Sequence, residues 1–175
     1  MANSPLNEIM QRFGAAVVER AMLNLGVYRT VNGKKRRAVA SDTLRNSLAF
    51  YYNGNSSKIE FFAKGKAANY ASVVEWGRRK GAKMPPIDAI VEWMRIKPIR
   101  VRDDKGKIIK QTPSVVRGAA YNIALGISRK GIPPLFYWRD AVNDMIVEFE
   151  PEFVAALNKE INLVIEDNLQ KKIKV

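Results

Sequence analysis

The segment ANYASVVEWGRRKG, residues 68–81, joins a short apolar stretch to a glycine and then to cations. Its residue choice predicts a short helix over residues 67–76, which Gly77 ends. An acid and a tryptophan, Glu75 and Trp76, stand at the end of that helix. The cations that follow at once are Arg78, Arg79 and Lys80. The question is why both signs of charge gather at one turn.

The composition is that of one domain of ordinary size. With 175 residues, 47% of them apolar, the chain can bury about two-thirds of the surface that its unfolded form exposes. No apolar run approaches the 18 or so residues that a membrane helix needs, and the first residues lack the pattern of a secretory signal. We therefore expect one domain over residues 1–175, located in the cytoplasm, with no membrane partner.

Cysteine and histidine are both absent, which excludes several kinds of site. Structural zinc sites, disulfides, cysteine nucleophiles and Ser-His-Asp triads all need one of these residues. Carboxylate chemistry, with or without Mg²⁺, and acid–base chemistry at lysine or tyrosine remain open.

A few acidic residues remain as catalytic candidates, but the sequence gives each of them little support. Glu75 could act as a general base, and Asp103 with Asp104 could bind a metal. Adjacent acids in a turn point in different directions and serve the turn, whereas Mg²⁺ needs carboxylates that converge from different elements. No phosphate-binding or dinucleotide motif is present. We expect no enzymatic activity, no cofactor and no metal site.

The charge is strongly basic, with 30 Lys and Arg against 17 Asp and Glu and a net charge of +13. Such a surplus favours contact with a polyanion or an acidic partner. A solvated loop or a protected edge strand would carry similar cations. The candidate residues for DNA or an acidic partner are Lys34, Lys35, Arg36, Arg37, Arg100 and Arg102.

Local signals divide the chain into helices and hairpins. Ser4 and Pro5 begin a helix that ends near Gly26, and residues 29–42 have the composition of a mobile loop. Two strands, 47–52 and 58–64, flank an Asn-Gly-Asn-Ser-Ser turn. A helix begins at Ile87, and basic and apolar residues alternate in a second hairpin over 99–110.

The last third of the sequence predicts helices. Thr112 and Pro113 cap a helix that Gly131 ends, and two helices follow over about 136–149 and 151–172, divided by Pro151. The fold class is therefore α+β, an antiparallel β-sheet packed against several helices, with an inserted helix and basic β-hairpin at about 85–111.

Three motifs in a fixed order resemble the neck or tail-completion proteins of tailed bacteriophages. The first is Thr43-Leu44-Arg45-Asn46-Ser47-Leu48, at the start of the first hairpin. The second runs from Tyr70-Ala71 through Val74-Glu75-Trp76-Gly77 to Arg78, where that family commonly has threonine. The third is Pro134-Leu135-Phe136 with Ala141. The likeness spans roughly residues 5–145.

The resemblance implies a structural role in the virion. Such subunits form a homo-oligomeric ring at the junction of capsid and tail, next to other neck, portal and tail proteins, and the genome passes through the lumen. Opposite charges at the turn would then set the register between neighbouring subunits. Tryptophans beside charges are also enriched at interfaces. The expected interface residues are Glu75, Trp76, Arg78, Arg79 and Lys80. The basic loop would line the channel or face an acidic ring.

Two other functions stay open at this point. The chief alternative is a free-standing basic protein that binds DNA or RNA. A metal-dependent nuclease is the third.

Overall fold

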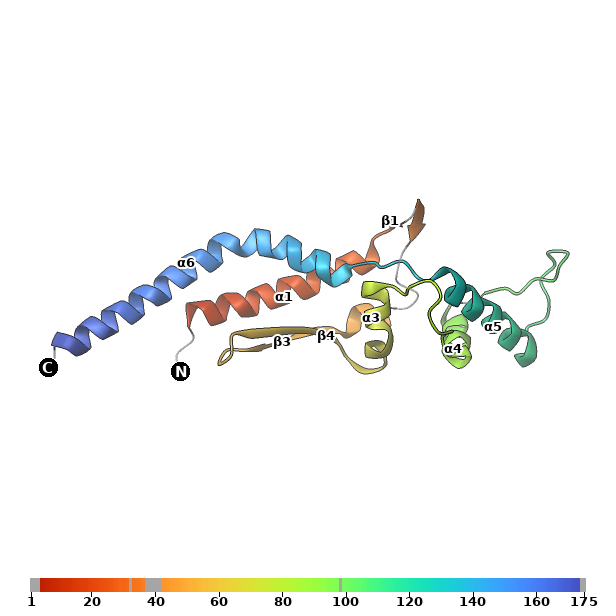
Figure 1. Cartoon of the computed structure of the whole chain (residues 1–175), viewed down its shortest axis with the longest axis horizontal. Coiled ribbons are helices and arrows are strands. Elements are labelled where there is room, and N and C mark those ends of the chain that lie inside the picture. The colour runs from red at the N-terminus through yellow and green to blue at the C-terminus, as the bar shows by residue number, and fades with distance from the viewer. Residues whose placement is uncertain (1–3, 32, 37–41, 98, 174–175) are drawn as a thin grey trace. The chain divides into compact units, whose positions relative to one another are not determined.

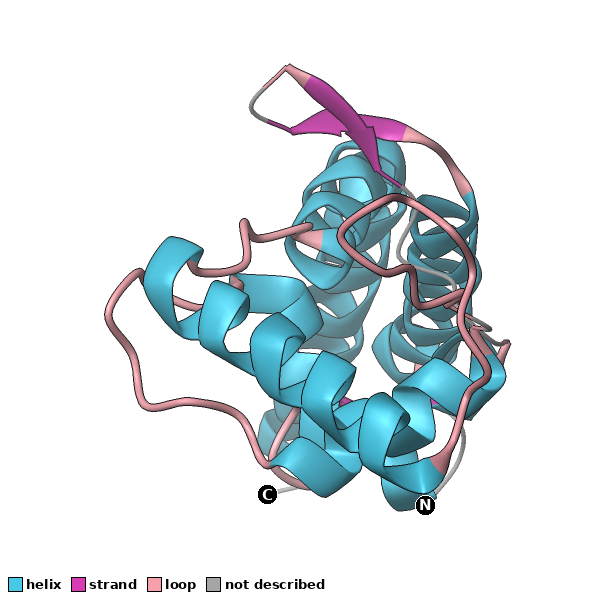
Figure 2. Cartoon of the chain, turned by 90° about the vertical axis from the view of Figure 1, so that its right-hand side faces the viewer, coloured by secondary structure: helices cyan, strands magenta, loops and turns pink. Residues whose placement is uncertain are grey.

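The computed structural model describes residues 4–31, 33–36, 42–97 and 99–173 (Figure 1). The chain is mostly helical, an α+β structure with small antiparallel sheets, and helices dominate in Figure 2. The elements in chain order are α1 (Pro5–Gly26), β1 (Arg29–Val31), β2 (Lys34–Arg36), α2 (Thr43–Ser47), β3 (Leu48–Asn53), β4 (Lys58–Ala63), a 3-10 turn (Gly65–Ala67), α3 (Ala68–Trp76), α4 (Ile87–Ile96), α5 (Pro113–Lys130) and α6 (Tyr137–Ile173).

The chain divides into two compact units. The long-helix unit comprises Met1–Leu25, Ser47–Gly65 and Tyr137–Val175, and so contains α1, the β3–β4 hairpin and α6. The basic unit comprises Gly26–Asn46 and Lys66–Phe136, and so contains the remaining elements. The expectation of a single domain stays a prediction.

Helices α1 and α6 run antiparallel along the long-helix unit. Each buries a row of residues at four-residue spacing, which gathers them on one face of the helix. The salt bridges from Arg12 to Glu152 (2.6 Å) and from Arg20 to Asp144 (2.9 Å) fix the direction. These ion pairs are exposed, so each contributes at most about 1 kcal/mol to the free energy of unfolding. The buried rows are Phe13, Val17, Ala21 and Leu25 on α1, and Tyr137, Ala141, Met145 and Phe149 on α6.

The β3–β4 hairpin packs on α1, and its strands pair in antiparallel register, with Phe50 opposite Phe61. Phe13 contacts Phe61 edge-on at 6.5 Å between ring centroids. Gly14 makes room for the hairpin, because a Cβ there would overlap the Phe50 ring and lie 2.9 Å from the Ile59 Cδ1. The expected hairpin of residues 47–52 and 58–64 is confirmed.

Pro151 does not divide the last helix, so the expected pair of helices over 136–149 and 151–172 is wrong. Helix α6 is continuous over 37 residues, and Figure 1 shows that it bends near its middle. Pro151 is exposed, as is Val147, whose carbonyl loses the helical donor. Water can serve that carbonyl on the convex side, while Phe149 keeps its packing on the other side.

Two further expectations need correction. Residues 29–42 were expected as a loop, but β1 and β2 pair there, with Thr30 opposite Lys35, and residues 37–41 lie outside the described part. The inserted hairpin over 99–110 is a loop closed by one bridge, between Arg102 and Ile108. Asp103 serves this turn as expected, because its carboxylate accepts the backbone N–H of Lys105 at 3.0 Å and of Lys107 at 2.8 Å.

We expect Gly14→Ala to lower the free energy of unfolding by about 1–3 kcal/mol, because the added methyl overpacks the Phe50 ring. Gly118→Ala is the matched control, since nothing lies within 4 Å of its Cβ position on α5. It should raise the free energy of unfolding by roughly 0.5–1 kcal/mol, the usual gain in a helix interior. Urea unfolding followed by circular dichroism measures both. An equal rise in the free energy of unfolding of the two variants would contradict the close packing of Gly14 against Phe50.

Candidate functional site

Two segments far apart in the sequence pair in the basic unit. The backbone N–H of Arg78 donates to the Ile132 carbonyl at 2.7 Å, and the N–H of Ile132 donates to the Arg78 carbonyl at 2.8 Å. Next to this bridge, Leu135 N–H donates to the Val74 carbonyl at 3.1 Å, and Phe136 N–H to the Glu75 carbonyl at 3.0 Å. The second and third sequence motifs therefore form one structural site.

Two glycines make this pairing possible. Gly77 has a φ of 72° and Gly131 a φ of 74°, in the left-handed region that side chains other than glycine rarely adopt. A Cβ at Gly77 would overlap the Ile132 carbonyl and lie 2.6 Å from the Pro134 nitrogen. A Cβ at Gly131 would overlap the Arg78 carbonyl. Each glycine ends a helix and admits the opposite backbone.

Residues after this bridge hold the turn against the end of α5. Gly81 N–H donates to the Ser128 carbonyl at 2.8 Å, and the Ser128 hydroxyl donates to the Ala82 carbonyl at 2.6 Å. The N–H of Gly131 donates to the Ile127 carbonyl at 2.8 Å. The carbonyls of Ile127 and Ser128, two of the last four in α5, are therefore satisfied by backbone N–H groups.

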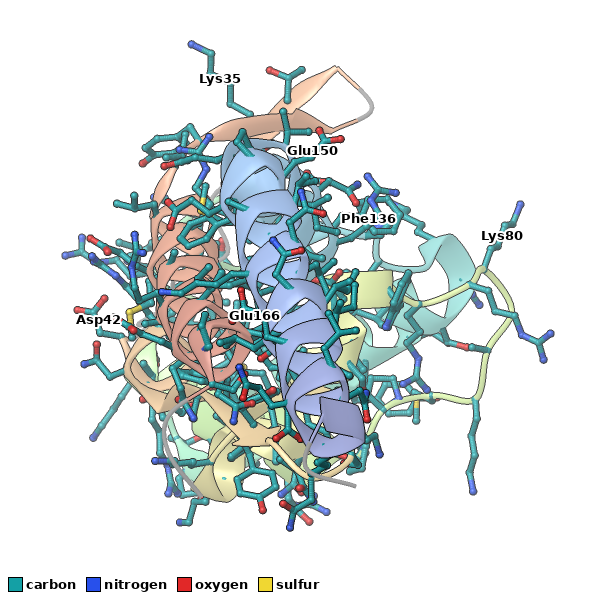
Figure 3. All side chains as sticks on the ribbon, turned by 90° about the vertical axis from the view of Figure 1, so that its left-hand side faces the viewer. Lys35, Asp42, Lys80, Phe136, Glu150 and Glu166 are labelled. Carbon is teal, nitrogen blue, oxygen red and sulfur yellow. The ribbon has the colours of Figure 1, made fainter. Side chains whose placement is uncertain are left out.

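The expected interface residues divide into inward and outward groups. Glu75 is buried, with 3% of its surface exposed, and Arg78 is partly buried and donates from Nη2 to the Lys83 carbonyl. Trp76 is 65% exposed and contacts Phe136 edge-on, at 5.9 Å between ring centroids. The remaining two, Arg79 and Lys80, are exposed, and Figure 3 shows the Lys80 side chain pointing away from the ribbon.

The turn brings together cations that the sequence analysis had not grouped. Because Gly81 and Ala82 bond to Ser128, the loop lies beside the last turn of α5, which carries Arg129 and Lys130. All the cations involved are exposed. No acid among the described residues forms a salt bridge with them. We call this group the turn cluster; its members are Arg79, Lys80, Lys83, Arg129 and Lys130.

The other expected DNA or acidic-partner residues lie on β2 and on the loop after α4. Lys35 is exposed on β2, as Figure 3 shows, and Lys34 and Arg36 flank it on that strand. Arg37 lies outside the described residues. Arg100 and Arg102 are exposed, and Arg102 Nη1 donates to the Gly106 carbonyl at 2.7 Å.

Only one of the two units has a net positive charge. The basic unit holds 21 Lys and Arg against 6 Asp and Glu, a net charge of +15. The long-helix unit holds 9 against 11, a net charge of −2. The net charge of the basic unit therefore favours contact with an anionic partner.

A second candidate surface lies on the far part of α6. Arg12 pairs with Glu152 near the start of α1, so most of α6 after Ala156 extends past α1 (Figure 1). From Leu157 to Lys171 every side chain is exposed except the half-buried Glu160. Four apolar residues at helical spacing share one face there. We call them the α6 stripe: Leu157, Ile161, Val164 and Ile165.

Tyr70 and Lys58 each have a shifted pKa. Burial raises the pKa of the Tyr70 phenol, and the hydrogen bond that Lys58 donates to the Glu60 carboxylate raises the pKa of Lys58. Within the described ranges, no three Asp or Glu side chains lie close enough together to hold a metal ion. The helices in these same ranges include none long and apolar enough to cross a membrane.

Comparison of the chain with protein-family models, with curated proteins and with solved structures found no match.

We expect Gly77→Ala to destabilise the basic unit more than Gly81→Ala. Both glycines have a positive φ, which costs alanine about 1–2 kcal/mol, but nothing lies within 4 Å of a Cβ at Gly81. Gly77→Ala should lower the free energy of unfolding by about 1–3 kcal/mol more than Gly81→Ala does, because its Cβ would overlap the Ile132 backbone. Hydrogen exchange at the Arg78 and Ile132 amides reports the loss locally. Equal protection of these amides in the two variants would contradict the close approach.

Proposed function

We propose that this chain is a structural virion protein of a tailed bacteriophage, a neck or tail-completion subunit that forms part of a ring at the head–tail junction. In this role it connects the capsid and portal side to the tail and lets DNA pass. It works with copies of itself and with neighbouring neck, portal and tail proteins, without a cofactor and without catalysis.

The observation that carries the proposal is the α6 stripe. Ile161 and Val164 are 55% and 60% exposed, although residues of this kind stabilise a fold only when they are buried. A contiguous apolar face of this kind marks a contact with another protein. The occupant that we propose is a second copy of this chain, because every subunit of a ring repeats the same contact.

The paired motifs give further support. The resemblance rests on motifs around Glu75 and Phe136, and these lie next to each other through two backbone hydrogen bonds. The exposed Trp76 stands at this site against Phe136. Exposed tryptophans are enriched among the residues that dominate binding energy between proteins.

A free-standing nucleic-acid-binding protein is the second candidate function. The net charge of +15 in the basic unit is the observation that favours it. A protein of that kind would not need the α6 stripe, and substitutions there would leave it a functional monomer.

We expect Ile161→Gln to weaken self-association at least tenfold, because it places an amide in the centre of the stripe. Leu163→Gln is the matched control: Leu163 is 51% exposed on the opposite side of α6. Sedimentation velocity over a range of protein concentrations measures both. The proposal requires one closed oligomer for the wild type and for Leu163→Gln. A wild-type monomer at every concentration, or equal loss in both variants, would contradict it.

A further inference from the structure

We propose that the turn cluster is a binding site for the phosphate backbone of double-stranded DNA. This inference goes beyond the ring, because it assigns Arg79 and Lys80 to a nucleic-acid contact together with three cations from Lys83 and the end of α5. It holds whether or not the chain forms a ring.

The cluster is a product of the fold. Arg129 and Lys130 directly follow Ser128, which bonds to Gly81 and Ala82 of the loop, so exposed cations from two distant segments stand on neighbouring stretches of backbone. Gly77 and Gly131 allow the two backbones to approach closely enough for this. A sequence-neutral phosphate site requires this kind of convergence of mobile cationic side chains.

The cations at the end of α5 are not needed to satisfy the carbonyls of Ile127 and Ser128. Cations near a helix C-terminus commonly offset the partial negative charge of its last carbonyls. Here the carbonyls of Ile127 and Ser128 already accept N–H donors from Gly131 and Gly81. The side chains of Arg129 and Lys130 are therefore free to engage a ligand.

The surroundings favour phosphate over an acidic protein. Protein interfaces are depleted of lysine at their centre and enriched in apolar and aromatic residues. The structure describes every residue from Gly77 to Arg95 and from Asn122 to Met145. No large hydrophobic side chain is exposed in these two ranges. Trp76 is exposed just before this turn, and Asp88 and Glu92 are exposed within these ranges, but cations outnumber them. Such a surface suits a partner that presents regularly spaced phosphates.

The test is binding of the full chain to a fluorescent 30-base-pair duplex of mixed sequence, followed by anisotropy as salt rises. The cluster variant combines Arg79→Gln, Lys80→Gln, Arg129→Gln and Lys130→Gln. The control variant combines Lys58→Gln, Lys64→Gln, Lys159→Gln and Lys171→Gln, exposed lysines of the long-helix unit. Both variants lose the same net charge. A second control changes Lys66, Lys105, Lys107 and Lys110, exposed lysines of the basic unit, to Gln.

We expect the cluster variant to lose at least tenfold in affinity at low salt. Its slope of log affinity against log salt should fall by about 3–4, since each phosphate contact contributes about 0.9. Both controls should lose much less. Circular dichroism and the sedimentation measurement verify that each variant is folded and show its oligomeric state.

Three results would overturn the inference. Equal loss in all three variants would mean that total charge, not this site, attracts DNA. Tighter binding of the wild type to polyglutamate than to the duplex would identify an acidic protein as the partner. Loss of self-association with unchanged DNA affinity in the cluster variant would return Arg79 and Lys80 to a subunit interface. The α6 stripe variants test the ring separately.

Discussion

The basic unit depends on one close approach of two backbones, between Arg78 and Ile132. Its two hydrogen bonds are ordinary in length, but the approach is sterically open only because Gly77 and Gly131 have no side chain and adopt a positive φ. From this point the chain on one side leads to the end of α3 and the chain on the other to the end of α5. The exposed tryptophan, the buried Glu75 and the turn cluster all take their positions from it.

The two units differ in net charge and in exposed apolar surface, so each suits a different kind of contact. The long-helix unit is close to neutral and carries the apolar α6 stripe, which suits packing against another copy. The basic unit carries a net charge of +15 and an exposed cluster of cations, which suits a polyanion. The two contacts that we propose, an apolar one with a second copy and a charged one with an anionic ligand, therefore use separate surfaces.

The sequence predicts those parts of the fold that local chemistry decides. Thr112 before Pro113 predicts the start of α5, and the Thr112 hydroxyl accepts the Val115 N–H at 3.4 Å as an N-cap does. The turn residues between 53 and 58 predict the β3–β4 hairpin with strand bounds close to those observed. These signals work because the residues that form each contact are close together in the chain.

The sequence does not predict what tertiary position decides. Pro151 is a helix breaker by its local chemistry, yet it stands on the exposed side of α6, where the lost hydrogen bond can be replaced by water. The bridge from Arg78 to Ile132 joins distant segments and has no periodic pattern. The one available signal was the recurrence of a glycine directly after a helix and beside cations, at Gly77 and again at Gly131. The turn cluster was missed for the same reason, since three of its cations come from one segment and two from the other.

Electron microscopy of the purified full-length chain at high concentration tests the central claim most directly, that this protein acts by assembling with copies of itself. The account predicts closed rings of uniform diameter whose averaged images show α6 of each subunit in contact with its neighbour. Isolated subunits or open, irregular chains in every field would contradict it.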